Sequence, residues 1–291
     1  MGLAVVTGAT GYLGPYVVRA LRERAPALQI RCVVRASSRT APIRLPGVTS
    51  AIADLRDPDA LYAAFQGADT LINLASLGFD WTENVVRTAQ RANIRRAVFI
   101  STTAILTALS VRSKPVRVRG EEMVRQSELA WTILRPTMIY GTPKDRNIAR
   151  LIRLIDVSPI VPLFAPRALQ QPIHVEDVAW AVAAAVGNEK TVGRIYNISG
   201  AQPLTMESLA REVAAALGRS RLFIRVPLWP VVGMLSLWER LRRPPISPEQ
   251  VRRVGENKSF DHAEAARDFD FSPRDFRAGI KTEVELFRNP G

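Results

Sequence analysis

Near its N-terminus the chain reads Leu3-Ala-Val-Val-Thr7 and then, without interruption, Gly8-Ala9-Thr10-Gly11-Tyr12-Leu13-Gly14. The apolar, β-branched run predicts a buried strand, and the residues that follow the turn have helical periodicity. Glycine permits positive φ angles and lets a ligand approach the backbone closely. Three glycines between a strand and a helix therefore predict a turn that binds a pyrophosphate at the helix N-terminus. The alternative is a glycine-rich turn without a ligand.

Strand-like and helix-like patterns alternate from this turn to about residue 140. We expect strands at 3–7, 30–34, 48–52, 70–74, 97–101 and 131–140, with helices at 13–24, 58–66, 81–92 and 120–127. Near-continuous apolar runs, such as residues 70–74, are typical of parallel strands buried on both faces. The order predicts an α/β fold, a doubly wound Rossmann-type parallel sheet, over residues 1–140.

The alternation breaks up after residue 140, where prolines separate short elements. Helices are expected at 175–186 and 206–217 and strands at 194–199 and 221–226, with Thr205 as N-cap of the second helix and Gly218 at its end. Residues 141–291 are therefore expected to form a smaller substrate-binding region, with some elements returning to the first domain. We expect this region to lie as a lid over the carboxyl edge of the sheet, where open α/β folds bind ligands.

The composition excludes several functional classes. The 291 residues include 40 basic and 27 acidic ones, a net charge of +13, but the arginines are scattered and no nucleic-acid-binding motif is present, so no nucleic-acid partner is expected. One cysteine and two histidines predict neither a disulfide framework nor a zinc site. The first strand begins almost at Met1, which leaves no room for a signal peptide, so a cytoplasmic protein is expected.

One apolar segment raises the question of a membrane. Residues 226–238 contain two tryptophans and several leucines and valines, and arginines follow up to Arg243. The segment is shorter than the roughly 20 residues that cross a bilayer. Three alternatives stay open: a peripheral membrane contact through residues 226–243, a core helix, or one wall of an apolar substrate pocket.

The end of the second strand distinguishes between cofactors. An acid there would accept hydrogen bonds from the adenosine ribose of NAD and repel a 2′-phosphate. The chain has Val33-Val34-Arg35-Ala-Ser-Ser-Arg39 instead, without an acid. Arg35 and Arg39 suit a phosphate monoester, so the sequence predicts NADP. The alternative is NAD, with Arg35 stacked on the adenine.

Several motifs together resemble the short-chain dehydrogenase/reductase superfamily in its extended or atypical branch. This branch includes sugar-nucleotide epimerases and dehydratases and the NADPH-binding accessory subunit of respiratory complex I. Besides the glycine turn, the motifs are Ala53-Asp-Leu-Arg-Asp57, Asn73-Leu-Ala75, Val98-Phe-Ile-Ser-Thr-Thr103, Trp131-Thr-Ile-Leu-Arg-Pro-Thr-Met-Ile-Tyr-Gly141 and Ile173-His-Val-Glu-Asp-Val-Ala179.

The resemblance implies roles for single residues. Asp54 would bond the adenine amino group, Ala75 would line the ribose, and Thr103 would hold the place of the catalytic Ser or Thr; the remaining cofactor contacts implied are Leu55, Ser101, Arg117 and Pro136. Two of these positions have structural alternatives, because Asp54 could cap the next helix and Thr103 could lie in a turn at the sheet end. His174 is interpreted as a polar residue at a helix N-terminus.

The sequence departs from the family at its proton donor, a Tyr with a Lys four residues later. Counting back from the helix that contains Glu121 places Ser113 and Arg117 at these positions. A Tyr140…Lys144 pair has the same spacing, but a glycine and a proline interrupt it, so we interpret it as accidental and leave only Tyr140 as a residue that could face the substrate. The remaining side chains near that end are basic, namely Arg112, Lys114, Arg117 and Arg119.

Two functions follow from the sequence. The first is an NADP-binding, atypical extended enzyme, an oxidoreductase or an epimerase- or dehydratase-like protein. It would act on a nucleotide sugar or another anionic or apolar small molecule, with Thr103 and Tyr140 as candidate catalytic residues. The second is a catalytically silent NADPH-binding protein that serves assembly, sensing or scaffolding. An apolar segment 226–238 that lines a pocket would favour the first, and an exposed one the second.

Overall fold

The structure, a computed structural model, describes residues 2–109, 113–142, 144, 145, 147–230, 233, 238 and 255–288. Its centre is a parallel sheet of seven strands in the order β11-β6-β5-β4-β1-β2-β3. These strands are β1 (Leu3–Thr7), β2 (Gln29–Val34), β3 (Val48–Ile52), β4 (Thr70–Asn73), β5 (Arg96–Ile100), β6 (Ala130–Pro136) and β11 (Arg194–Ile198). The predicted doubly wound fold is confirmed, and the order reverses between β1 and β4.

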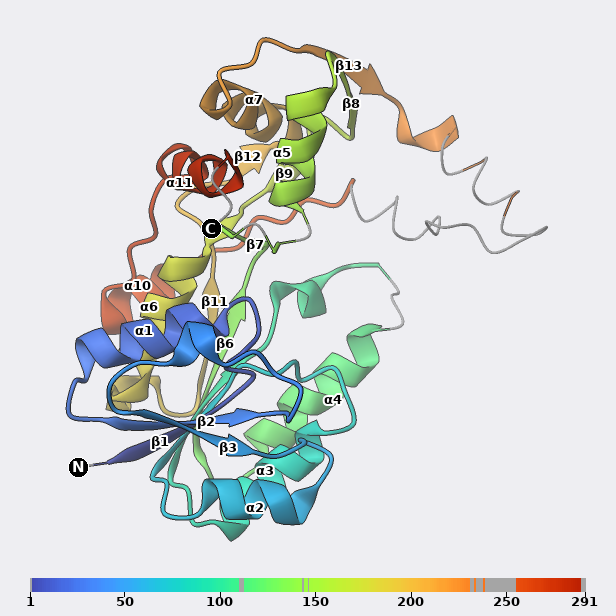
Figure 1. Cartoon of the computed structure of the whole chain (residues 1–291). Helices are drawn as coiled ribbons and strands as arrows, with labels where there is room; N and C mark the ends of the chain where they lie inside the picture. The colour runs from blue at the N-terminus through green and yellow to red at the C-terminus, as the bar shows by residue number, and fades with distance from the viewer. Residues whose placement is uncertain are drawn as a thin grey trace.

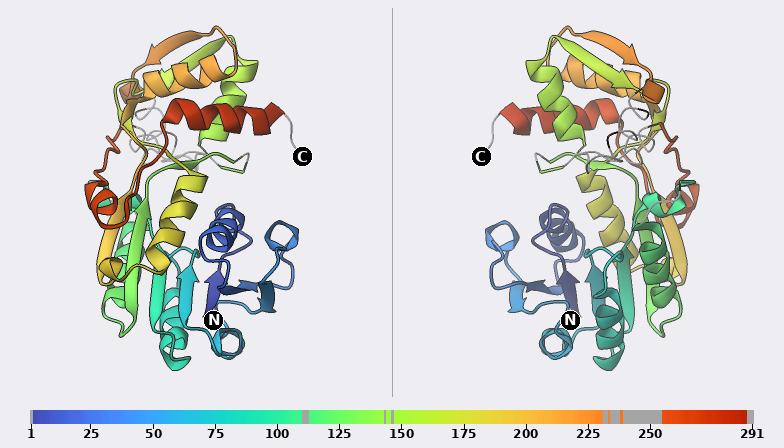
Figure 2. Two further views of the ribbon diagram at one scale, coloured as in Figure 1. Left: turned by 90° about the vertical axis from the view of Figure 1, so that its left-hand side faces the viewer. Right: turned by 90° about the vertical axis from the view of Figure 1, so that its right-hand side faces the viewer.

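Helices cover both faces of this sheet (Figures 1 and 2). One face carries α2 (Pro58–Phe65), α3 (Thr82–Arg91) and α4 (Ser113–Arg125), and the other carries α1 (Gly14–Arg24) and α6 (Val175–Val186). Neighbouring residues of a strand pack into different cores: Val5 lies among the buried residues of the first face and Val6 among those of the second. Burial on both faces explains why these strands are apolar at successive positions.

The predicted strand at residues 131–140 is two strands. β6 ends at Pro136, and the chain turns away at Thr137, whose N–H donates to the Ile198 carbonyl (3.0 Å) and whose hydroxyl donates to the Gln171 carbonyl (2.5 Å). The following strand, β7 (Ile139–Tyr140), pairs with β10 (Ile173–His174) outside the main sheet. Helix α4 begins at Ser113 and not at residue 120 as expected.

The remaining elements form a second body with its own core, here called the C-terminal lobe. It contains α5 (Ile148–Val157), β8 (Ile160–Phe164), β9 (Leu169–Gln170), β12 (Leu204–Thr205), α7 (Met206–Ala216), β13 (Leu222–Val226) and α11 (Phe276–Arg288). Thr205 caps α7 by accepting the Ser208 N–H (3.0 Å), and Gly218 follows the helix with φ +64°, as expected. The elements that were not expected include α5, β8, α11 and α10 (Ala263–Phe269), which packs against β11.

Three short 3₁₀ helices complete the described elements. They are η1 (Ala41–Ile43), η2 (Thr103–Leu106) and η3 (Glu189–Thr191). The C-terminal lobe lies beyond the end of the sheet at which β1 and β4 end (Figure 1). The chain crosses between the two bodies several times. Strand β11 is part of the sheet and α6 packs on it, although both follow residue 140.

Candidate functional site

The glycine turn has the geometry of a tight strand-to-helix connection. Gly8 has φ +71°, and a Cβ atom there would lie 3.0 Å from the Ala75 nitrogen. Gly11 donates its N–H to the Gly8 carbonyl (3.0 Å). A Cβ on Gly14 would lie 2.0 Å from the Ala9 carbonyl oxygen, so this position admits only glycine. Helix α1 begins here, and its first N–H groups and dipole favour an anion at the turn.

A cleft of about 590 Å³ adjoins the turn, and we call it the first cleft. It is lined by Gly8, Thr10, Gly11, Val33, Val34, Arg35, Ser38, Ala53, Asp54, Leu55, Arg56, Leu74, Ala75, Phe79 and Trp81. The predicted residues Arg35, Asp54, Leu55 and Ala75 are thus brought together with the glycine turn. Arg39 lies exposed four residues beyond Arg35, outside this lining set.

Ser38 joins the second strand to the turn. Its hydroxyl accepts the Arg35 N–H (3.2 Å) and lies 3.4 Å from the Thr10 hydroxyl. Asp54 is exposed, and its carboxylate accepts the Arg56 N–H (2.9 Å). The cap of α2 is Asp57, not Asp54, so the structural alternative for Asp54 is wrong.

Sequence reasoning missed two features of the first cleft. The Asn73 side chain accepts the Thr7 hydroxyl (2.6 Å) and donates to the Ala75 carbonyl (2.9 Å), which fixes the ends of β1 and β4 relative to each other. Phe79 and Trp81 stack with ring centroids 4.3 Å apart and offer an apolar surface to a flat ring. This aromatic pair, in the loop between β4 and α3, was visible in the sequence as a signal.

Two further clefts continue from the first. The second, about 240 Å³, is lined by Tyr12, Leu13, Leu74, Ser76, Leu77, Ile100, Ser101, Thr102, Arg117, Pro136, Thr137 and Ile139. The third, about 410 Å³, is lined by Thr102, Thr103, Ala104, Leu106, Thr107, Thr137, Met138, Asn147, Gln170, Glu256, Asn257, Lys258 and Phe260. Leu74 is shared by the first two, and Thr102 and Thr137 by the last two. The three clefts therefore adjoin one another along the carboxyl edge of the sheet.

The second cleft is held by a buried ion pair. Glu121 on α4 accepts the Ser101 hydroxyl (2.5 Å) and pairs with the Arg135 guanidinium, whose Nε lies 2.9 Å away. This pair joins α4 to the ends of β5 and β6. Ser101 lines the cleft, but its hydroxyl proton is directed to Glu121.

Ser113 and Arg117, the two residues predicted to stand at the dyad positions, lie differently on helix α4. Ser113 is exposed in the first turn of the helix. Arg117, one turn later, lines the second cleft, and its stem crosses Gly78 so closely that a Cβ there would lie 3.0 Å from Arg117 Cγ. Lys114 donates to the Thr107 carbonyl (2.7 Å) and Arg119 is exposed, while Arg112 lies outside the described residues.

Thr103 begins η2 and is buried at the edge of the third cleft. Its hydroxyl donates to the Pro136 carbonyl at 3.3 Å, a weak bond. Thr102, the residue before it, caps η2 by accepting the Ala104 N–H (3.2 Å). The position expected to carry the catalytic hydroxyl thus faces the third cleft.

Tyr140 does not have the position expected of a proton donor. It is 1% exposed in the core of the C-terminal lobe, against the Phe276 ring (centroids 4.9 Å apart) and the His174 ring (5.3 Å). A Cβ on Gly279 would lie 2.2 Å from its hydroxyl oxygen. Burial raises the pKa of this phenol above its ordinary value of 10.0. The prediction that Tyr140 faces the substrate is therefore wrong, because α11 covers the ring.

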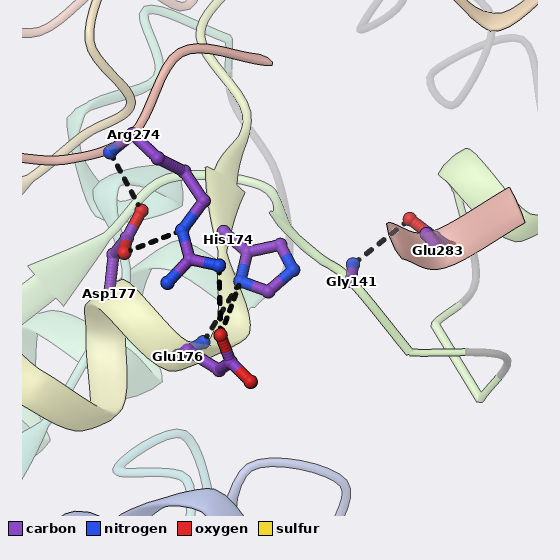
Figure 3. A network of polar contacts seen from close by, with 6 residues as sticks. All are labelled: Gly141, His174, Glu176, Asp177, Arg274 and Glu283. Carbon is purple, nitrogen blue, oxygen red and sulfur yellow. Dashed lines mark hydrogen bonds and ion pairs between the residues drawn. The ribbon is translucent and has the colours of Figure 1, made fainter. Parts of the chain in front are cut away.

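His174 caps α6, as its interpretation as a helix-end residue predicted. Its Nδ1 accepts the Glu176 N–H (3.3 Å), and burial lowers the pKa of the imidazole to about 4, so the ring is neutral. Beside it the Arg274 side chain joins Asp177 (2.9 Å) and Glu176 (2.8 Å), as Figure 3 shows. This contact fastens the segment before α11 to α6.

Residues 226–243 do not contribute to the three clefts where the structure describes them. Val226 ends β13, Trp229 is exposed, and none of the described residues of this segment lines any of the clefts. Residues 226–243 were expected to form a wall of the substrate pocket, but residues 256–258 and Phe260 line the third cleft instead. The rest of the segment lies outside the described residues. Within the described part of the chain, no helix combines the length and the apolarity needed to cross a bilayer.

Comparison with other proteins agrees with this geometry. The NAD(P)H-binding family matches residues 8–189. Ceramide reductase from Caulobacter vibrioides is 32% identical over 195 residues, 63% of this chain and 60% of that protein. Subunit 9 of the NADH dehydrogenase [ubiquinone] 1 alpha subcomplex of Rattus norvegicus is 29% identical over 223 residues, 68% of this chain and 56% of that protein. The match thus spans less than two thirds of either relative.

Solved structures share the whole fold at low identity. An NADPH-dependent quinone oxidoreductase from Escherichia coli superposes with a TM-score of 0.76 at 22% identity, covering 98% of this chain and 99% of that one. A nucleoside-diphosphate-sugar epimerase from Pseudomonas aeruginosa gives a TM-score of 0.82 at 18% identity, covering 100% and 98%. The chain belongs to the NAD(P)H-binding family, and it shares its fold with the quinone oxidoreductase and the epimerase.

Proposed function

We propose that the protein is an NADP-dependent oxidoreductase or epimerase-like enzyme that binds its substrate in the third cleft. The observation that carries the proposal is the row of three adjoining clefts, which runs from Arg35, past the shared residue Leu74, to Thr102 and Thr137. A dinucleotide with its pyrophosphate on the glycine turn would place its adenosine in the first cleft and its nicotinamide in the second. Bound NADPH would supply a hydride there, and bound NADP⁺ would accept one.

The first cleft supports NADP over NAD. Arg35 lines it, Ser38 lies between Arg35 and the turn, and residues 35–39 include no carboxylate that would repel a 2′-phosphate. A guanidinium binds a phosphate monoester through two parallel hydrogen bonds. One protein of the same fold is named as NADPH-dependent.

The third cleft supports a substrate with a polar or anionic group beside an apolar part. Threonine, asparagine and glutamine side chains and Lys258 lie there with Leu106, Met138 and Phe260. The relatives named ceramide reductase and quinone oxidoreductase are consistent with a carbonyl on a largely apolar molecule. A nucleotide sugar is the alternative that the epimerase fold suggests.

Hydride transfer to a carbonyl carbon must be matched by a proton at the oxygen. Thr103 is the candidate at the third cleft: because its hydroxyl donates to the Pro136 carbonyl, it would accept a hydrogen bond from a water, and that water would deliver the proton to the substrate oxygen. The Arg117 guanidinium stays charged at any ordinary pH, and so it orients an anionic group instead of donating a proton.

A catalytically silent NADPH-binding protein is the second candidate. The feature in its favour is α4, which contains Ser113 and Arg117, the two residues that the count back from Glu121 assigns to the Tyr and Lys positions. One relative is named as a subunit of an NADH dehydrogenase, which is consistent with a role in an assembly.

The cofactor assignment is tested by thermal unfolding with NADPH and with NADH. Ligand at 100 times its dissociation constant adds about 2.7 kcal/mol, a shift of several degrees. We expect the larger shift from NADPH, loss of the difference in Arg35→Ala, and no change in Arg44→Ala, an exposed control outside the lining of the first cleft. Equal shifts from both cofactors would reject NADP.

Two measurements distinguish an enzyme from a catalytically silent NADPH-binding protein. The first is NADPH consumption with carbonyl substrates, and the second is mass spectrometry of the molecules that copurify with the protein. If the protein is an enzyme, we expect turnover, and Thr103→Val should lower the turnover rate by about a hundredfold or more without changing NADPH binding. NADPH binding without turnover, and without a copurified substrate, would favour the silent protein.

A further inference from the structure

The first cleft contains an aromatic ring that the fold leaves open. Phe79 lines this cleft and is 51% exposed. Trp81 stacks on the Phe79 ring, with the centroids 4.3 Å apart and the ring planes at 23° to each other. The rest of the Phe79 ring is therefore an apolar surface inside a cleft, which a flat ligand can cover.

Hydrogen bonds hold the aromatic pair in place. The Trp81 indole N–H donates to the Ser76 carbonyl (3.2 Å). The Phe79 carbonyl accepts the hydroxyl of Thr82 (3.1 Å), the first residue of α3. Leu77, in the same loop, is buried. A ligand that binds here meets a surface that is already ordered, so it does not bear the entropy cost of ordering the loop.

The pair is also tied to the segment after β3. The Asn84 side chain donates to the carbonyls of Leu55 and Arg56 (3.4 and 3.3 Å). The Arg56 guanidinium lies over the Trp81 ring, 5.4 Å from its centroid. Asp54 in this segment lines the same cleft, and its carboxylate has acceptor sites beyond the one that binds the Arg56 N–H. An open aromatic face beside a carboxylate suits a flat heteroaromatic ring that carries an amino group.

We propose that the open face of Phe79 stacks on the adenine of the cofactor, with Trp81 packed behind it. The inference rests on the proposed function, in which the adenosine lies in the first cleft. It assigns the stacking to Phe79 and leaves Arg35 to the 2′-phosphate, in contrast to the alternative in which Arg35 stacks on the adenine. Stacking involves only the base, so Phe79 contributes equally to the binding of NADPH and of NADH.

The test is calorimetric measurement of dissociation constants for the full chain with three ligands. They are NADPH, NADH and 2′-phospho-ADP-ribose, which has the adenine half of NADPH without the nicotinamide. Loss of an aromatic side chain that stacks on a base weakens binding by about tenfold, so Phe79→Ala should weaken all three ligands by about this factor. Phe79→Tyr keeps the ring and is the matched control, which should bind like the wild type. Arg35→Ala should weaken NADPH and 2′-phospho-ADP-ribose but not NADH.

Thermal melting without ligand checks that the variants are folded, and both changed side chains are exposed. Unchanged binding in Phe79→Ala would overturn the proposal, and so would a loss with NADPH that 2′-phospho-ADP-ribose does not share, because the ring would then not contact the adenine. Weaker NADH binding in Arg35→Ala, without a loss in Phe79→Ala, would assign the stacking to Arg35.

The same measurements distinguish this inference from the proposed function. A wild type that binds NADPH and NADH equally, with the same loss in Phe79→Ala for both, would reject the preference for NADP and uphold the stacking. A wild type that binds none of the three ligands would reject both.

Discussion

At the scale of single residues, the Tyr140 hydroxyl has no hydrogen-bond partner among the described residues, although it is fully buried. An unpaired buried hydroxyl lowers stability by roughly 1–3 kcal/mol. Tyr140→Phe keeps the ring and removes the hydroxyl, so we expect an unchanged or increased free energy of unfolding and unchanged activity. Tyr140→Ala, the control, should lose about 3 kcal/mol in urea unfolding because it leaves a cavity. A large loss of activity in Tyr140→Phe would show that the hydroxyl reaches the substrate.

Glu283 on α11 predicts a dependence of stability on pH. Its carboxyl accepts the Gly141 N–H (2.9 Å), and burial together with the neighbouring Asp145 raises its pKa from 4.5 to about 9. Between these values the folded protein holds the proton and the unfolded chain does not. The stabilisation is therefore complete below pH 4.5 and is lost as the pH rises towards 9.

Glu283→Gln keeps the acceptor for Gly141 and removes the titration. We expect the variant to gain stability relative to the wild type between pH 5 and pH 9, measured by urea unfolding at several pH values. The interactions of His174 are the same in both proteins, so its opposite dependence at acid pH cancels in the difference. A difference that does not change with pH would contradict the raised pKa.

At the scale of elements, the connection from β1 to α1 depends on Gly14. A Cβ there would meet the Ala9 backbone, which cannot move without breaking the turn. We expect Gly14→Ala to lower the free energy of unfolding by about 3 kcal/mol or more and to abolish the thermal shift with NADPH. A Cβ on Gly187, at the end of α6, would meet nothing within 4 Å, and its φ is negative, so Gly187→Ala is the matched control and should be neutral.

The segment before α10 forms a wall of the third cleft. The Glu256 carboxylate accepts the Thr107 hydroxyl (2.6 and 2.7 Å) and the Ala108 N–H (2.8 Å), which fixes the segment to the loop after η2. Glu256→Ala should raise KM about tenfold and leave NADPH affinity unchanged, because the first cleft is not touched. Glu264→Ala, an exposed acid on α10, is the control. Weaker NADPH binding in Glu256→Ala would show that the segment supports the cofactor as well.

The local sequence pattern predicted the strands and helices of the first half of the sheet. It missed contacts between residues that lie far apart in the sequence. The strand, glycine turn and helix of residues 3–24 form from neighbouring residues, so their sequence indicates both the fold and the anion site. Helix α5 buries Ile148, Ile152 and Ile155 at helical spacing, a pattern that was readable among the prolines. The contact of Glu256 with Thr107 joins residues 149 apart, and no local pattern predicts it.

At the scale of the whole molecule, the C-terminal lobe is attached through several crossings. The chain leaves the sheet after β6, returns for α6 and β11, leaves again for α7 and β13, and returns for α10. The Arg274 contacts with Asp177 and Glu176 fasten the last crossing, towards α11.

The position of β11 in the sheet also affects folding while the chain is being synthesised. Strand β6 pairs with β5 on one side and with β11 on the other, but β11 begins only at Arg194, about 60 residues after β6 ends at Pro136. At roughly 5–20 residues per second, β6 stays an edge strand for roughly 3–12 seconds after it leaves the ribosome. Its apolar residues, Ile133 and Leu134 among them, are then open to pairing with other nascent chains. Slow translation between the two strands would therefore lower the yield of folded protein more than the same delay after Ile198.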